Sequence, residues 1–327
     1  MSEPLFTLAE LERAQEVVGR TMLGTPQYAW PLLGERIGAE VWLKHENHTP
    51  IGAFKVRGGL AYLDVLCSRN SRPNGLITAT RGNHGQSIPY AASRYELSVT
   101  VVVPVGNSVE KNKAMQAWGA KLIVHGEDFD EAKVEAERLA ERDGLELVPA
   151  FHPALVCGVA TYAHEFLTAC DDLDTVYVPI GMGSGICGLI TTRDLLGLKT
   201  EIVGVVSAHA KAYALSFESG QVVETDTAKT FADGIACRMP SNSALEVMLS
   251  GAARIVCVSD DEIADAMRAI YADTHNIAEG AGAAAFAALT KEKARVHGRK
   301  VGVVLTGGNI DTVLFAQVLR GETPLIS

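Results

Sequence analysis

The sequence predicts an α/β protein with two lobes, each a twisted, mostly parallel β-sheet wound with helices. Short apolar runs alternate with helix-like stretches along the whole chain, which is the pattern of parallel strands joined by crossover helices. The run at residues 98–104 has no polar alternation, as expected for a parallel strand buried on both faces. Glycine-rich loops follow several runs, at the sheet edge where such folds bind ligands.

In the first half of the chain, strand-like and helix-like stretches follow one another in turn. The helix predicted at residues 128–142 is charged and amphipathic, and it ends at Asp143 and Gly144. Strands are predicted at residues 40–44, 75–80, 98–104 and 121–125, and helices at residues 56–67, 86–94, 110–118 and 128–142.

The second half continues the pattern, with strands predicted at residues 175–180, 201–206, 254–258 and 300–305. Helices fill the gaps, including the alanine-rich stretch 280–291. The sequence has no internal repeat, low-complexity tract or proline-rich linker. We therefore expect the chain to cross between the lobes near residues 48 and 147. This gives a large domain of residues 1–47 plus 148–327 and a small domain of residues 48–147.

The amino-acid composition limits the classes of protein to which the chain can belong. The chain has 327 residues, of which 47% are hydrophobic and 21% charged, as in a soluble globular protein with an ample core. A net charge of −10 without a basic run argues against nucleic acid and anionic membranes as partners. No apolar run approaches the roughly 20 residues of a membrane helix, and no signal peptide is recognisable. The six cysteines lack CxxC or metal-finger spacing, so we expect reduced thiols in a cytoplasmic protein.

Lys55 is the first candidate for chemistry. It stands between Phe54 and Val56 in a segment, residues 52–59, that also holds three glycines. A lysine among apolar neighbours loses its proton more readily, and a neutral amine is the nucleophile that imine-forming enzymes need. A surface charge is the alternative for a single lysine. The glycine loop at residues 80–86 and another at residues 181–188 strengthen the chemical interpretation.

The loop at residues 181–188 follows the predicted strand 175–180 and precedes a helical stretch. Backbone amides at such a turn bind phosphate through their N–H groups and the positive helix end. Gly183, Gly185 and Gly188 also match GxGxxG, the dinucleotide pattern. That site needs an acidic residue after the next strand, but Ser207 stands there. A phosphate cup is therefore favoured over a nicotinamide site, and close helix–strand packing is the third alternative.

Taken in order, these segments resemble the serine/threonine dehydratase family, the second fold type of pyridoxal-phosphate enzymes, whose fold is like that of the tryptophan synthase β-subunit. The resemblance spans nearly the whole chain, and several motifs in a fixed order are more specific than any one. They are Thr25-Pro26, KHE at 44–46, GAFKVRG at 52–58, GNH at 82–84, the loop 181–188, ADG at 232–234, EGAG at 279–282 and TGGN at 306–309.

The resemblance implies roles toward pyridoxal 5'-phosphate, which the large domain would bind. Lys55 would form the Schiff base and later shuttle the Cα proton, with Phe54 packed beside the ring. Asn83 would hydrogen-bond the phenolic oxygen. Thr306 would place a neutral hydroxyl at the pyridine nitrogen, which makes a weaker electron sink than a carboxylate partner and favours β-elimination over transamination. The phosphate would lie on Gly181, Met182, Gly183, Ser184 and Gly185.

On the substrate side, the resemblance implies that Thr80, Gly82 and His84 receive the amino acid's carboxylate. Arg81 replaces the serine or alanine usual in relatives. Related racemases use that serine as their second acid or base, so Arg81 argues against racemisation. Its guanidinium could bind an anionic substrate group such as the side chain of 3-hydroxyaspartate, or it could turn outward and brace the loop on a neighbouring acid.

Many relatives bind a cation after the strand that corresponds to residues 201–206, through acidic residues at two positions. Val206 and Ala212 occupy those positions here, so we expect no metal. Lys211 lies between them, and its ammonium either takes the place of the ion or is simply solvated.

The resemblance implies a pyridoxal-phosphate lyase that converts a β-hydroxy-α-amino acid to a 2-keto acid and ammonia. Threonine and serine are the default substrates. Phenylserine and hydroxyaspartate stay open because residues 53, 81 and 182 depart from the family pattern. Racemisation or β-replacement, an NAD-dependent oxidoreductase and a non-catalytic role are the alternatives. We expect a homodimer, as is usual among relatives. Because 16 residues follow Asp311 (327 − 311), we also expect the catabolic type, without a regulatory domain.

Overall fold

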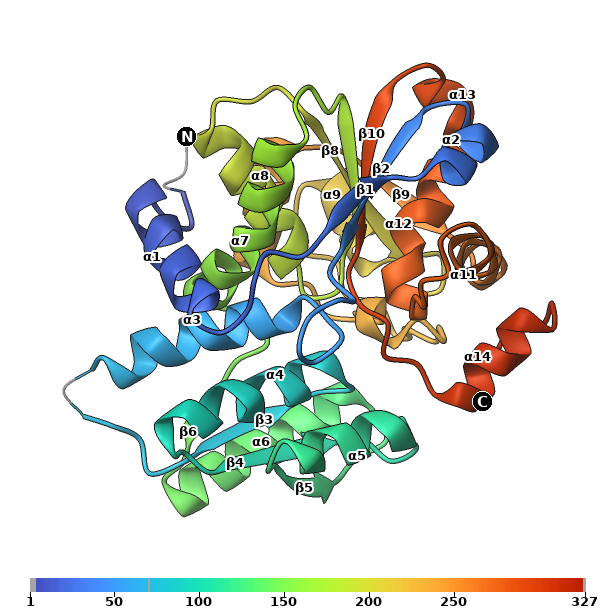
Figure 1. The fold of residues 1–327 in the computed structure, drawn as a ribbon. Coiled ribbons are helices and arrows are strands. Elements are labelled where there is room, and N and C mark those ends of the chain that lie inside the picture. Colours follow the sequence, from blue (N-terminus) through green and yellow to red (C-terminus); the bar gives the residue numbers. More distant parts are fainter. Residues whose placement is uncertain (1–3, 70, 326–327) are drawn as a thin grey trace.

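The computed structural model describes residues 4–69 and 71–325, and it has the predicted α/β fold with two separate sheets (Figure 1). The larger sheet has six strands, and all its neighbouring strands are parallel except the pair β1 and β2. In spatial order they are β1 (Gln27–Ala29), β2 (Glu40–His45), β10 (Lys300–Leu305), β7 (Thr175–Pro179), β8 (Glu201–Ser207) and β9 (Ala252–Val258).

The smaller sheet has four strands, all parallel. It forms the lower lobe in Figure 1, drawn in teal and green. In spatial order its strands are β5 (Lys121–Val124), β4 (Val99–Val103), β3 (Leu76–Ala79) and β6 (Glu146–Leu147). Its strands come from the middle of the chain, but the exact domain bounds near residues 48 and 147 stay a prediction.

Both faces of the larger sheet are buried, because successive residues of its strands enter two different cores. Val203 and Val205 pack with the helices α11 (Asp260–Thr274) and α12 (Gly280–Lys291). Ile202 and Val206 pack on the opposite face. The helices on that face include α7 (Pro153–Ala169) and α8 (Ser184–Leu195). This double burial explains why these strands read as continuous apolar runs.

The smaller sheet is covered in the same way. Val101 and Val103 of β4 pack toward the helices α3 (Lys55–Cys67) and α4 (Asn83–Ala92), whereas Val102 packs toward α6 (Phe129–Asp143). The helix α6 begins at its capping residue Asp128 and ends at Gly144, whose φ of 64° suits glycine. The helix α3 also contacts α7, so it joins the two lobes.

Some of the remaining helices also pack on the larger sheet: Leu33 and Ile37 belong to one of its two cores, and Ala244 and Met248 belong to the other. No helix among the described residues is long and apolar enough to cross a membrane. The elements not yet described are α1 (Leu8–Gly19), α2 (Pro31–Ile37), α5 (Val109–Ala117), α9 (Ala212–Ser219), α10 (Asn242–Gly251), α13 (Lys293–Val296), α14 (Thr312–Leu319) and the short 3₁₀ turns η1 (Ser93–Tyr95) and η2 (Asp233–Ile235).

Candidate active site

A pocket lies where the carboxyl ends of β3, β7 and β10 meet the start of α3. Ligand sites of parallel sheets are expected at such strand ends. The structure brings every site residue predicted from the sequence into the lining of this one pocket: Phe54, Lys55, Thr80, Arg81, Gly82, Asn83, His84, Gly181, Met182, Gly183, Ser184, Gly185 and Thr306.

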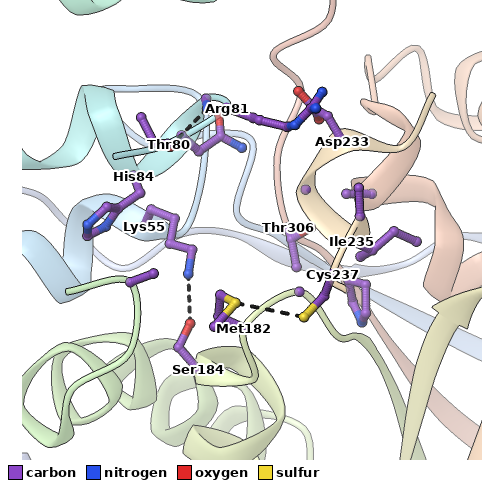
Figure 2. Close-up of a pocket in the computed structure, with 18 of the residues that line it drawn as sticks. Lys55, Thr80, Arg81, His84, Met182, Ser184, Asp233, Ile235, Cys237 and Thr306 are labelled. Carbon is purple, nitrogen blue, oxygen red and sulfur yellow. Dashed lines mark hydrogen bonds between the residues drawn. The ribbon is translucent and has the colours of Figure 1, made fainter. Parts of the chain in front are cut away.

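Lys55 is the first residue of α3, and its side chain extends into the pocket (Figure 2). Its Nζ donates a hydrogen bond to Ser184 Oγ at 2.9 Å and lies 4.9 Å from the centre of the Phe54 ring. Burial lowers the pKa of the Lys55 ammonium from 10.5 to about 8, because water is not there to solvate the charge. The structure therefore provides a nucleophilic amine near neutral pH.

The segment 181–185 forms a backbone cradle between β7 and α8. A Cβ atom on Gly181 would lie 2.2 Å from the carbonyl oxygen of Gly234, so only glycine fits there. Gly183 has a φ of 98°, which a residue with a side chain rarely adopts. α8 begins at Ser184, and its first N–H groups have no carbonyl partner within the helix. Such a helix start attracts an anion.

The start of α4 forms the opposite wall. The backbone N–H of Gly82 donates to Thr80 Oγ at 3.0 Å, which shapes the turn into the helix. His84 is buried, and its Nε2 has no hydrogen-bond partner among the described residues. Burial, with a further contribution from the Lys55 charge, lowers the pKa of His84 to about 3. A neutral ring with a free polar atom is therefore available to a ligand in the pocket.

Asn83 and Thr306 lie in the same lining. Asn83 Nδ2 donates to Glu279 Oε1 at 2.6 Å, and Asn83 Oδ1 accepts from Asn309 Nδ2 at 2.8 Å. These two bonds fix the orientation of the Asn83 amide. Thr306 directly follows β10 and is buried in the pocket wall (Figure 2).

Three charged residues of the pocket were given no role by the sequence: Lys111, Asp233 and Glu279. Lys111 Nζ lies 2.6 Å from Asp233 Oδ2 and 3.0 Å from Glu279 Oε2. Burial alone would lower the pKa of Lys111, but the charges of Asp233 and Glu279 outweigh it and raise that pKa above its ordinary value. Burial raises the pKa of Glu279, although Lys111 opposes the shift. Asp233 and Glu279 stand in recognised motifs, whereas Lys111 stands in a helix whose composition predicts exposure.

The positions compared with a family cation site were Val206, Lys211 and Ala212. Lys211 is exposed, and Val206 and Ala212 are buried. Across residues 4–69 and 71–325, no three His, Cys, Asp or Glu side chains are grouped so that they could hold a metal ion. The exposure of Lys211 favours a solvated side chain over a buried substitute for an ion. Independence from metal stays a prediction.

Comparison with known proteins places the fold and the site in context. A family model described as "Pyridoxal-phosphate dependent enzyme" matches residues 18–307. The L-threonine ammonia-lyase of Thermotoga maritima is 31% identical over 317 residues, which cover 97% of this chain and 79% of that protein. The L-threo-3-hydroxyaspartate ammonia-lyase of Saccharomyces cerevisiae is 30% identical over 311 residues, with coverage of 95% and 94%.

Among solved structures, a pyridoxal 5'-phosphate-dependent aspartate racemase matches with a TM-score of 0.90 and 25% identity. The match covers 95% of this chain and 98% of the racemase. Each of these similarities extends over both sheets, so the lobes and the pocket between them belong to one shared architecture.

Proposed function

Because the chain belongs to the pyridoxal-phosphate-dependent enzymes, and within them to the serine/threonine dehydratase family, we propose that it removes water from a β-hydroxy-α-amino acid and releases a 2-keto acid and ammonia. The observation that carries the proposal is the Lys55 amine, which lies within hydrogen-bond distance of Ser184 at the backbone cradle 181–185. An amine beside an anion site is what a phosphorylated aldehyde requires.

The residues of the pocket fit pyridoxal 5'-phosphate. When bound, this group supplies an aldehyde that condenses with amines and a ring that stabilises negative charge at Cα. Lys55 would hold the aldehyde carbon, and Asn83 would face the phenolic oxygen. Thr306 would face the pyridine nitrogen. The backbone of residues 181–185 would bind the phosphate, and the missing Cβ of Gly181 lets this segment pack closely against Gly234.

The chain's own groups then perform three tasks. The turn before α4, with Thr80, Gly82 and His84, receives the substrate carboxylate and orients the Cα–H bond toward Lys55. The Lys55 amine, released when the substrate's own amine takes its place, accepts the Cα proton, and a positioned base of this kind contributes roughly 10²–10⁴-fold in rate. The proton taken from Cα balances the one that the β-hydroxyl needs to leave as water, and the released enamine takes up one water to give the keto acid and ammonia.

Racemisation is the second candidate, since the aspartate racemase has the same fold. It requires a second acid or base on the face of Cα opposite Lys55. Arg81 stands where racemases of this family are expected to carry a serine, and a guanidinium offers N–H donors but no acceptor for a proton. The chemistry of Arg81 therefore favours elimination over racemisation. The expected homodimer and the cytoplasmic location stay predictions.

A substrate panel tests the proposed function. The purified holoenzyme is incubated with serine, threonine, phenylserine and 3-hydroxyaspartate, and keto acid and ammonia are measured together. We expect equal amounts of both products from at least one substrate, and no change of chirality in the substrate that remains. Chirality loss without keto acid would favour the racemase instead.

The Lys55→Ala variant is the control for this panel. It should lose essentially all turnover and the yellow colour of the bound cofactor, because no other pocket residue offers a neutral amine near pH 7. A colourless wild-type protein that needs added nicotinamide would contradict the proposal and favour an oxidoreductase.

A further inference from the structure

Among the described residues of the pocket lining, Arg81 is the charged side chain that has no ion-pair or hydrogen-bond partner, whereas the others are paired. Its side chain is half-buried in the pocket lining. Within residues 4–69 and 71–325 it makes no ion pair and no side-chain hydrogen bond, although the other cations of the pocket, Lys55 and Lys111, each have a partner. A guanidinium presents five N–H donors and binds carboxylates in pairs of parallel hydrogen bonds.

The acid toward which Arg81 points already has a cationic partner. Figure 2 shows the Arg81 side chain running across the pocket toward Asp233. Asp233 is paired with Lys111 at 2.6 Å, and Lys111 also binds Glu279. Asp233 and Arg81 are not within ion-pair distance of one another. Lys111 therefore neutralises the charge of Asp233, and the guanidinium of Arg81 remains available to bind a ligand.

The substrate's α-carboxylate has a different receptor. His84 Nε2 is buried without a partner, and the start of α4 presents free N–H groups next to it. In Figure 2, Arg81 extends away from both Lys55 and His84. A group bound by Arg81 therefore lies on another side of the pocket from the α-carboxylate, and the substituent on Cβ is the part of the substrate left to extend there.

We propose that Arg81 receives an anionic group on the substrate's Cβ, so that the preferred substrate is a β-hydroxy dicarboxylic amino acid of the 3-hydroxyaspartate type. This inference rests on the proposed function and specifies its substrate. Serine and threonine carry hydrogen or methyl at that place and would leave the guanidinium without a partner. For hydroxyaspartate the products are oxaloacetate and ammonia: one water leaves in the elimination, and one is consumed when the enamine hydrolyses.

The test compares kcat/KM for 3-hydroxyaspartate and serine in the wild type, Arg81→Ser, Arg81→Lys and a control. The control is Arg20→Ser, which alters an exposed arginine at the C-terminal cap of α1. We expect the wild type to prefer hydroxyaspartate. The ratio of the two kcat/KM values should fall about 10–100-fold in Arg81→Ser, as for the loss of a charge-assisted pair, and less in Arg81→Lys. Arg20→Ser should keep the wild-type ratio.

A binding measurement tests the same contact without turnover. Aspartate and alanine lack the β-hydroxyl, so their affinities are read from the change in the visible spectrum of the holoenzyme. Aspartate should bind the wild type about 10–100-fold more tightly than alanine, and this preference should disappear in Arg81→Ser.

Two results would overturn the inference. One is a wild type that shows no preference for hydroxyaspartate over serine or for aspartate over alanine. The other is an equal loss for both substrates in Arg81→Ser, which would make Arg81 a receptor for the α-carboxylate or a brace for the loop. Absence of keto acid from every substrate in the panel would instead contradict the proposed function itself.

Discussion

At the scale of single residues, the environment of Lys55 sets the fraction of its side chains that is the neutral amine needed for the proposed attachment of the cofactor. With a pKa of about 8, roughly a tenth of the Lys55 side chains are neutral at pH 7. An ordinary lysine at 10.5 would be neutral in about 0.03% of molecules at that pH. Burial therefore increases the nucleophilic fraction by about 300-fold.

This difference predicts the pH dependence of cofactor loading. When cofactor-free protein is mixed with pyridoxal 5'-phosphate, the yellow colour should appear about tenfold faster per pH unit below pH 8 and then level off. The sign follows from the lowered pKa, since the neutral amine is fully available once the pH exceeds it. Stopped-flow absorbance gives the rate, and Lys113→Ala serves as the control. A rate that keeps rising to about pH 10 would contradict burial of Lys55.

At the scale of elements, the helix α5 links the smaller sheet to the larger lobe. Ser108, which caps α5, donates to Asp311 Oδ1 at 2.5 Å, and Thr312 N–H donates to Glu110 Oε1 at 2.9 Å. Lys111, one turn into the helix, reaches Asp233 and Glu279. Because Glu279 also accepts from Asn83, the ion cluster connects this helix to the predicted cofactor contact.

Removing the Lys111 ammonium should destabilise the protein strongly. Lys111→Met leaves the buried Glu279 carboxylate without its cation, and breaking a buried pair typically costs about 3–5 kcal/mol. Lys113→Met, on the exposed side of the same helix, should change stability by no more than about 0.5 kcal/mol. Urea unfolding of the cofactor-free proteins at pH 7 measures both. Because the folded-state pKa of Lys111 is raised, its contribution is fully present at pH 7, below the ordinary value of 10.5, and is lost as the pH rises from there through the folded-state pKa.

The double variant Lys111→Met with Glu279→Gln separates pairing from simple packing. If the cost arises from an unpaired carboxylate, the neutral glutamine should recover part of the loss. Equal destabilisation by Lys111→Met and Lys113→Met would show that the cluster adds nothing measurable.

The buried strands were predictable and Lys111 was not, for one physical reason. A strand such as β4, which is buried on both faces, consists of consecutive apolar residues, so a short stretch of sequence is enough to predict it. The elements β1 and β6 have three and two residues and are too short for such a pattern. Lys111 is buried through partners 122 and 168 positions away in the chain, and nothing nearby indicates them.

The site itself was recognisable because glycine loops and Lys55 lie in short motifs whose order is distinctive. The motifs could not predict the direction of the Arg81 side chain, because that direction depends on which residues the folded chain places near it. Two orientations were open from the sequence, and the structure has the one that faces the pocket.

At the scale of the whole molecule, the pocket joins loops from both sheets. Thr80 and His84 come from the smaller sheet's side, whereas Gly181 and Thr306 follow strands of the larger sheet. Without a ligand, the two lobes are connected through α3, α5 and a few ion pairs such as that between Arg238 and Asp130. A cofactor that contacts both sets of residues adds a further connection. Binding therefore favours the closed, two-lobed molecule over states in which either lobe unfolds.

We expect pyridoxal 5'-phosphate to stabilise both lobes together. A ligand present at about 100 times its Kd adds about 2.7 kcal/mol to the free energy of unfolding, which corresponds to a rise in Tm of several degrees for a chain of this size. Calorimetry of cofactor-free and loaded protein should show the whole unfolding transition moving upward. Pyridoxal, which lacks the phosphate, should raise Tm much less, because the cradle at residues 181–185 then has no anion to bind. An upward shift confined to one of two transitions would mean that the cofactor contacts a single lobe, and an equal shift with pyridoxal would mean that the cradle does not bind the phosphate.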